Sequence, residues 1–176
     1  MLLLHVVYYY MNWGDNMDFI YIGKIVSTHG IKGELRIISD FPYKDKVFIV
    51  GNKLIIDNNE YIIKSYRVHK NFDMVTLNDY HDINEVLFLL KKDVYVRRED
   101  IILDDDEILD EELITYKVLT KDGKEGIIEE IFKASQTNKV LRVMFDKEVL
   151  IPLFSPMILE INKDKKEIIV ELIDGM

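Results

Sequence analysis

The sequence predicts a mainly β protein in which two small β-barrels are joined by an acidic linker. Short runs of apolar and β-branched residues recur along the chain, with Gly, Asn and Asp between them, as in all-β domains. These runs stop over residues 98–112, where one Lys or Arg stands against nine Asp and Glu. The chain has 176 residues, 48% of them hydrophobic, which is enough for two small cores.

The amino-terminal barrel is expected over residues 18–97. The dipeptides Gly51-Asn52 and Asn58-Asn59 are turn signals within it. A helix is predicted to begin at Asp82, because Asp82 and Glu85 have capping-box spacing and four apolar residues follow at helical spacing, namely Ile83, Val86, Leu87 and Leu90. The predicted strands are Phe19–Val26, Glu34–Ile38, Val47–Val50, Lys53–Ile56, Tyr61–Val68 and Met74–Leu77, and Val94–Val96 closes the unit.

Residues 98–112 are predicted to be the linker, because the carboxylates of residues 104–107 repel one another and the apolar run 101–103 is too short to form a core alone. A second barrel is then expected over residues 113–176. Its turn signals are Lys121-Asp-Gly-Lys124, Asp146-Lys147 and the polar stretch 162–166. Its predicted strands are Lys117–Leu119, Gly126–Ile131, Val140–Phe145, Val149–Leu153, Ile158–Ile161 and Glu167–Leu172.

Residues 1–17 are expected to be a disordered amino-terminal extension, or an upstream start that is not used. The apolar stretch 2–11 lacks a basic flank and a small-residue cleavage site, so it does not read as a signal peptide. It is also too short to span a bilayer. A membrane-surface anchor is the alternative for this stretch.

The run from Tyr21 to Glu34 is the strongest candidate for a binding site. An apolar strand leads into a loop that contains Gly30 and Gly33, and a second strand follows. Such a loop can expose several backbone N–H groups. The basic residues nearby are Lys24, Lys32 and Arg36. This combination favours phosphate binding over catalysis.

Plainer interpretations of the same residues stay open. A Gly-x-x-Gly sequence often marks only a tight connection between strands. His29 can make a hydrogen bond across the turn, and Arg36 can form a rim salt bridge with Glu34 or Asp40. A weaker basic cluster is formed by Arg67, His69 and Lys70, which can equally be a solvated strand end.

Composition excludes several classes of site. The chain has no cysteine, which removes disulfides, thiol catalysis and zinc–thiolate sites and is compatible with a reducing cytosol. Its four histidines lack metal-ligand spacing, so no metal is expected. The net charge of −9 argues against a general nucleic-acid coat. The segments flanking the linker are close to neutral, however, and this permits local basic patches.

Several segments together resemble the RimM family of ribosome maturation factors. Gly23 to Ile25 and Thr28 to Glu34 match its amino-terminal signature, a Gly-Arg/Lys-Ile-Val strand running into Thr-His-Gly-Ile-Arg/Lys-Gly-Glu. The further matching segments are 94–100, 149–153 and 158–160, with Asn138 before Val140. The resemblance implies a translation-factor-like barrel followed by a PRC barrel, in a non-enzymatic cytoplasmic protein without a cofactor.

The resemblance also implies partners and site residues. The partners are a small-subunit ribosomal precursor with its 16S rRNA, and a ribosomal protein of the small-subunit head of the uS19 type. The protein is expected to be a monomer that binds no membrane. The RNA- or ribosome-binding residues are Thr28, His29, Gly30, Lys32, Gly33 and Arg36. The ribosomal-protein-binding residues are Asn138, Leu150, Pro152 and Phe154.

Some residues depart from the family pattern, and two other functions stay open. Ile108-Leu-Asp110 stands where family members often have Tyr-Tyr-Trp, and Thr115 and Lys139 replace the expected Gly and Asp. Pro152 favours a strand edge or end, and Phe154 is either core or docking surface. The alternative functions are a barrel enzyme that binds a flavin or another small ligand, and a PRC adaptor at a membrane.

Overall fold

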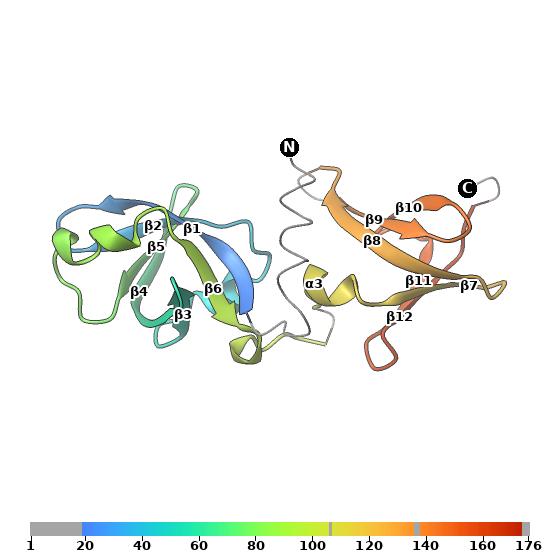
Figure 1. Ribbon diagram of the computed structural model, residues 1–176, viewed down its shortest axis with the longest axis horizontal. Coiled ribbons are helices and arrows are strands. Elements are labelled where there is room, and N and C mark those ends of the chain that lie inside the picture. Colours follow the sequence, from blue (N-terminus) through green and yellow to red (C-terminus); the bar gives the residue numbers. More distant parts are fainter. Residues whose placement is uncertain (1–18, 106, 136–137, 174–176) are drawn as a thin grey trace. The chain divides into compact units, whose positions relative to one another are not determined.

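The computed structural model describes residues 19–105, 107–135 and 138–173, and it divides into two compact units after Asp104. The predicted extension 1–17 lies outside the described residues. Both units are built mainly of strands, as Figure 1 shows, so the predicted fold class is confirmed.

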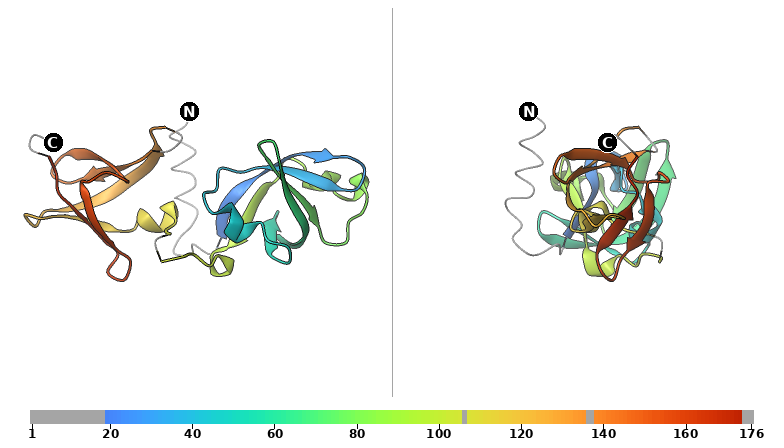
Figure 2. Two further views of the ribbon diagram at one scale, coloured as in Figure 1. Left: turned by 180° about the vertical axis from the view of Figure 1, so that it is seen from behind. Right: turned by 90° about the vertical axis from the view of Figure 1, so that its right-hand side faces the viewer.

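The first unit is a closed six-stranded barrel in the order β1-β2-β5-β4-β3-β6. Its strands are β1 (Phe19–His29), β2 (Glu34–Ile38), β3 (Lys53–Ile56), β4 (Asn59–His69), β5 (Phe72–Leu77) and β6 (Asp93–Arg97). All neighbouring strands are antiparallel, and the first strand pairs with the last. Figure 2 shows the ring of strands from behind.

Alternating residues of these strands fill the barrel. Along β2, Leu35 and Ile37 are fully buried, whereas Arg36 and Ile38 face outward. Strand β1 pairs with both β2 and β6 and carries a bulge toward each of them. The bulge toward β6 lies between Tyr21 and Gly23, and the bulge toward β2 lies between Ile25 and Ser27. Bulges increase local twist, which a closed barrel of six strands requires.

Two predicted elements of this unit are wrong. Val47–Val50 was expected to be a strand, but residues 44–47 form the short helix α2 (Lys44–Val47), and the N–H of Phe48 donates to the carbonyl of Lys44 at 2.9 Å. Four apolar residues in a row carry no period-2 signal. Val47 and Phe48 are buried here, while Ile49 and Val50 are exposed.

The helix predicted after Asp82 is instead two 3-10 turns, η1 (Ile83–Glu85) and η2 (Leu87–Leu89). Their hydrogen bonds span three residues, as in Val86 N–H to the Ile83 carbonyl at 3.2 Å. The buried residues are Val86 and Leu89, three apart, as a turn of three residues requires. The predicted capping box is confirmed.

The segment predicted as a linker has structure at both ends. It contains the 3-10 turn η3 (Arg98–Asp100) and most of the helix α3 (Asp110–Leu113). Ile101 and Leu109 are buried, and Lys139 holds both carboxylate oxygens of Asp110 at 2.7 Å. The stretch between Ile101 and Leu109 is therefore the part of the segment best suited to join the two units.

The second unit is a six-stranded sheet in the order β10-β9-β8-β7-β12-β11. Its strands are β7 (Lys117–Thr120), β8 (Glu125–Lys133), β9 (Lys139–Met144), β10 (Glu148–Pro152), β11 (Ile158–Asn162) and β12 (Glu167–Val170). β7 and β12 are parallel, and the other neighbours are antiparallel. Leu113, Leu141, Ile151 and Ile168 are fully buried members of its core. β10 and β11 are therefore the two edge strands of this sheet.

Candidate functional site

The glycine loop, defined here as residues 30–33, connects β1 to β2 and is braced from one side. Gly30 and Gly33 have φ of 65° and 74°, a backbone conformation that favours glycine. The amide of Ile83 donates to the carbonyl of Ile31 at 3.0 Å. A Cβ on Gly33 would lie 3.1 Å from the carbonyl oxygen of Asp82, so the loop packs directly against this turn.

The acidic residues of that turn are engaged with their own backbone. The carboxylate of Asp82 accepts from the N–H of Asn84 at 2.8 Å. Glu85 accepts from the N–H groups of His81 and Asp82 at 2.8 and 3.0 Å. These carboxylates cap the start of η1, the turn against which the glycine loop packs.

The loop presents one unpaired cation. Lys32 is exposed and forms no ion pair within the described part of the chain, whereas Lys24 is paired with Asp93 at 3.3 Å. An open hollow of about 410 Å³ lies beside the loop, lined by His29, Gly30, Ile31, Lys32, Glu34 and Thr76. Of the two lysines singled out around this loop, Lys32 is thus the one available to an anion.

Arg36 is held by two neighbours and not by a carboxylate. Its Nη2 lies 2.6 Å from Nδ1 of His29, and its guanidinium lies 5.6 Å from the centre of the Phe72 ring. Arginine can only donate, so Nδ1 of His29 is the acceptor in this contact. His29 therefore makes the hydrogen bond across the hairpin, and the salt bridge from Arg36 to Glu34 or Asp40 does not form.

Glu34 forms its ion pair with a different arginine, Arg67. Arg67 on β4 donates from Nε and Nη2 to the two oxygens of Glu34, at 2.7 and 2.6 Å. This bidentate contact lowers the pKa of Glu34 by hydrogen bonding and by charge, against the opposing effect of burial. The negative charge nearest to His29 on β2 is thus compensated within the barrel.

The structure adds residues of the next hairpin to the predicted site. The rings of His29 and His69 are 5.9 Å apart, although 40 residues separate them in sequence. His69 and Phe72 are register partners at the β4–β5 turn, and Lys70 between them is exposed. The basic cluster at Arg67, His69 and Lys70 therefore lies next to the first one.

Sequence reasoning missed Phe72 as a neighbour of Arg36. Arg36, Met74 and Arg67 form one register row across β2, β5 and β4. This row depends on which strands are adjacent in the barrel, which local patterns do not reveal. The alternation of Phe72, Met74 and Thr76 could have placed Phe72 on the outer face, but it could not have named Arg36 as its partner.

The predicted protein-binding residues lie on and beside the edge strand β10. Val149, Ile151 and Leu153 are buried, whereas Leu150 and Pro152 alternate with them and are exposed. Phe154 is 79% exposed, so it is not part of the core. The backbone carbonyl of Asn138 accepts from the N–H groups of Ala134 and Ser135. It precedes β9, and the N–H of Leu153 donates to the carbonyl of Lys139 at 2.9 Å, which places Asn138 and Phe154 at the same end of the strand pair.

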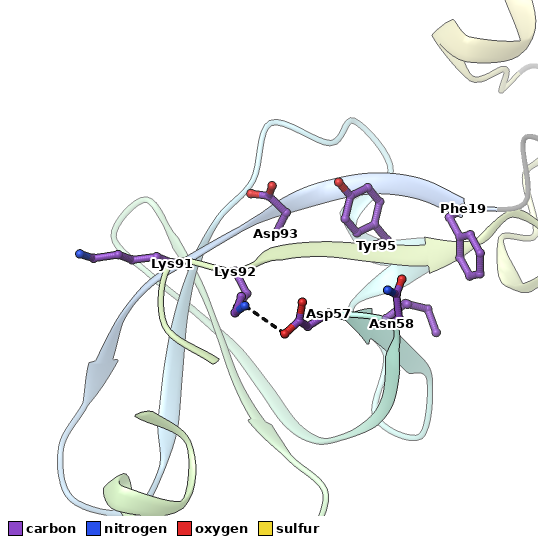
Figure 3. A pocket seen from close by; sticks show the side chains of 8 residues that line it. Phe19, Asp57, Asn58, Lys91, Lys92, Asp93 and Tyr95 are labelled. Atoms are coloured by element: carbon purple, nitrogen blue, oxygen red, sulfur yellow. Dashed lines mark hydrogen bonds and ion pairs between the residues drawn. The ribbon is translucent and has the colours of Figure 1, made fainter. Parts of the chain in front are cut away.

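A second hollow of the barrel, of about 320 Å³, is lined by several charged side chains, most of which are paired. Figure 3 shows Lys91 pointing away from the other side chains that line it. Lys92 is paired with Asp57 at 3.0 Å and Lys24 with Asp93. The charges around this hollow therefore largely compensate one another.

The part of the chain that the structure describes holds neither a metal-binding cluster nor a membrane-spanning helix. Over residues 19–105, 107–135 and 138–173, no three His, Asp or Glu side chains are placed to hold a metal ion. Within the same ranges, no helix has the length and apolar character needed to cross a bilayer.

Comparisons with known proteins agree on one family. The family described as "RimM N-terminal domain" matches residues 20–101. A ribosome maturation factor RimM of Exiguobacterium is 31% identical over 167 residues, covering 91% of this chain and 97% of its own. One from Staphylococcus aureus strain JH9 is 34% identical over 163 residues, covering 88% and 96%.

Two solved structures resemble the chain at lower identity. A Pseudomonas aeruginosa protein described as a 16S ribosomal RNA processing protein RimM is 22% identical with a TM-score of 0.44, covering 90% of this chain and 100% of its own. The N-terminal domain of RimM from Thermus thermophilus is 18% identical with a TM-score of 0.44, covering 49% and 98%. On the sequence matches to full-length relatives, the chain belongs to the ribosome maturation factor RimM family.

Proposed function

We propose that this protein assists maturation of the small ribosomal subunit by binding its precursor, without catalysing a reaction. The barrel contacts 16S rRNA through the glycine loop, with Lys32 on phosphate and Thr28, Gly30 and Gly33 shaping the loop. The β10 edge contacts a ribosomal protein of the subunit head, of the uS19 type, through Asn138, Leu150, Pro152 and Phe154. The protein acts as a monomer in the cytoplasm.

One observation carries the RNA part of the proposal: a braced loop presents an unpaired cation. The loop is fixed by two left-handed glycines and by the Ile83–Ile31 hydrogen bond, yet Lys32 is exposed without an ion pair in the described residues. A preformed loop loses little conformational entropy on binding. Phosphate contacts from lysine supply affinity that depends on salt.

The proposed role of Arg36 is narrower than that of Lys32. Arg36 is partly buried, and its Nε has no acceptor among the described residues. Its Nη2 is already held by His29. We therefore assign the phosphate contact to Lys32. Arg36 and His29, which contact each other, lie at the edge of the proposed RNA-binding surface.

Two modest contacts suit a chain with a net charge of −9. Linking two binding surfaces converts the second contact into an intramolecular event and raises the overall affinity. Neither unit then has to be strongly basic or strongly apolar. An exposed Phe154 next to the open edge of β10 supplies apolar area of the kind that protein interfaces use.

The test is co-sedimentation of the full chain with small-subunit precursors at several salt concentrations. Lys32→Glu is expected to weaken association and to make it less dependent on salt. Lys91→Glu is the matched control, because Lys91 is also exposed on this barrel and forms no ion pair in the described residues. Equal co-sedimentation of Lys32→Glu and wild type at low salt would remove the glycine loop from the binding surface.

A further inference from the structure

One face of the barrel combines aromatic rings with an arginine that pairs with no carboxylate in the described part of the chain. The four residues of this ring cluster are His29, Arg36, His69 and Phe72. They come from β1, β2, β4 and β5, which are neighbours in the barrel. All four are partly exposed.

The side chains of the ring cluster contact one another. Arg36 donates to His29 at 2.6 Å and lies over the Phe72 ring at 5.6 Å. The His29 and His69 rings are 5.9 Å apart with an interplanar angle of 34°. Because each side chain is fixed by another, the cluster forms a surface of flat groups that is organised before any ligand arrives.

A buried methionine supports this surface from below. Leu35 and Val75 are register partners that fill the barrel interior, so the next row, Arg36, Met74 and Arg67, points to the outer face. Met74 is nevertheless completely buried. The aliphatic stems of the two flanking arginines are suited to cover it, as long charged side chains do over apolar groups.

The charge around the cluster favours an anion. Glu34 is the acidic residue on these strands nearest to His29, and Arg67 neutralises it with two hydrogen bonds. Lys32 and Lys70 stand in the loops after β1 and β4, and both are exposed without an ion pair in the part of the chain that the structure describes. Together with Arg36 they leave the surface positive.

We propose that the ring cluster binds an unstacked base of single-stranded RNA, while Lys32 and Lys70 hold its backbone phosphates. This inference rests on the proposed function and specifies which form of RNA the barrel recognises. Aromatic and guanidinium planes stack on exposed bases, and the flanking cations follow the phosphates. In an A-form duplex the faces of the bases are already stacked, so the cluster discriminates against double-stranded RNA.

Phe72→Leu tests the stacking directly, because it removes the ring and keeps an apolar side chain. The probe is a labelled twelve-nucleotide oligouridine, with a twelve-base-pair RNA duplex as the second probe, and the readout is fluorescence anisotropy with the full chain. Loss of one stacked base is expected to weaken oligouridine binding about five- to hundredfold. Duplex binding, which uses only the lysines, is expected to stay within about twofold.

Two further variants guard against trivial outcomes. Tyr21→Leu is the matched control, since Tyr21 is 41% exposed on β1 and contacts Tyr95 on β6, away from the ring cluster. It is expected to bind both probes as wild type does. His69→Ala replaces Phe72→Leu if the latter lowers the unfolding temperature. Oligouridine binding that is unchanged in both His69→Ala and Phe72→Leu overturns the proposal, and so does wild-type binding of duplex as tight as that of oligouridine.

The same variants separate this inference from the proposed function. Wild-type protein that co-sediments with small-subunit precursors but shows no preference for single strands retains the function and refutes the ring cluster as a base site. Wild-type protein that binds oligouridine through Phe72 but does not co-sediment with any precursor retains the ring cluster and refutes the function.

Discussion

The ammonium of Lys44 donates to the carboxylate of Asp73 at 2.7 Å and joins the short helix α2 to strand β5. The Asp73 side chain is only 2% exposed, and its other oxygen accepts from the hydroxyl of Tyr66 at 2.9 Å. The Tyr66 ring stacks on Phe48, which directly follows α2. A buried carboxylate thus fixes the short helix that leads into the segment for which the sequence favoured a strand.

Asp73→Ala is expected to lower the free energy of unfolding by about 3 kcal/mol. Removing one partner of a buried ion pair leaves the other poorly solvated, which typically costs about 3–5 kcal/mol, and the partial exposure of Lys44 favours the low end. Urea denaturation measures the change. Asp79→Ala is the matched control, because its pair with Lys64 at 3.4 Å is 88% exposed on the Asp79 side, and it is expected to change stability little. Equal effects of the two substitutions would contradict the role of Asp73.

Tyr66 contributes stability to the barrel that is lost at alkaline pH. Burial, with the hydrogen bond to Asp73, raises the pKa of Tyr66 to about 12, from its ordinary value of 10.0. The folded state therefore keeps the proton longer than the unfolded state does. This contribution is complete below pH 10 and is lost as the pH rises toward 12.

The comparison that isolates this contribution is wild type against Tyr66→Phe. Wild type is expected to be the more stable protein at pH 8, and the difference in unfolding free energy should narrow between pH 10 and 12. The remaining tyrosines are common to both proteins and cancel. Urea denaturation at pH 8, 10 and 11 measures it, and a difference that stays constant across these values would be inconsistent with a raised pKa.

Two glycines of the β1–β2 hairpin are expected to respond differently to alanine. At Gly23 a Cβ would lie 2.5 Å from the carbonyl oxygen of Ile38, so Gly23→Ala forces the backbone of β1 and β2 apart. At Gly30 nothing lies within 4 Å of an added Cβ, and only the φ of 65° opposes it. Gly30→Ala should cost about 1–2 kcal/mol and Gly23→Ala clearly more. Thermal unfolding ranks the two, and the opposite order would show that the bulge at Gly23 relaxes freely.

The segment between Ile101 and Leu109 is expected to be cleaved first by proteases. Ile102 is 79% exposed, whereas the residues that bound the segment are buried. A protease that accepts apolar sites, such as thermolysin at low concentration, should yield two fragments that mass spectrometry maps to residues 102–108. First cuts within 61–77 or 140–153 would instead show that the two units are not the stable bodies of the chain.

Phe154→Asp is expected to weaken binding of the full chain to a ribosomal protein of the small-subunit head while leaving the unfolding temperature unchanged. Phe154 is 79% exposed, so a charge there carries little folding cost. Leu159→Asp, on the strand at the other end of the sheet order, is the control. A pull-down with the purified ribosomal protein measures both. Retention of the partner by Phe154→Asp at wild-type levels would move the contact away from the β10 edge.

The strands could be predicted from local pattern, but their neighbours could not. The predicted bounds of Glu34–Ile38 and Lys53–Ile56 are those of β2 and β3, because the alternating burial along β2 and the turn residues that flank β3 are encoded within a few positions. The prediction of a strand over Val47–Val50 failed because this segment is fixed by two distant contacts. Lys44 of α2 pairs with Asp73, and Phe48 stacks on Tyr66. Those contacts come from β4 and β5 and leave no trace in the local sequence.

The candidate site shows the same limit. The glycine loop is visible in sequence because Gly30 and Gly33 need left-handed backbone within four residues of each other. The contact of Arg36 with Phe72 and the assignment of Glu34 to Arg67 arise from the order of strands in a closed barrel. Electrostatic partners of residues on a sheet can therefore be assigned only once the neighbouring strands are known.

The pairing of β1 with β6 has a consequence for how the protein is made. Tyr21 and Tyr95 face each other in the closing seam, so the ring cannot be completed until the ribosome has released the chain beyond residue 97. Until then β1 has an open edge on that side, while the β1–β2 hairpin with its glycine loop can already form from contiguous residues. Hairpins form within microseconds, whereas translation adds about 5–20 residues per second. The β1–β2 hairpin is thus available seconds before β6, whereas the hydrogen bond from Ile83 to the glycine loop and the β1–β6 seam can form only later.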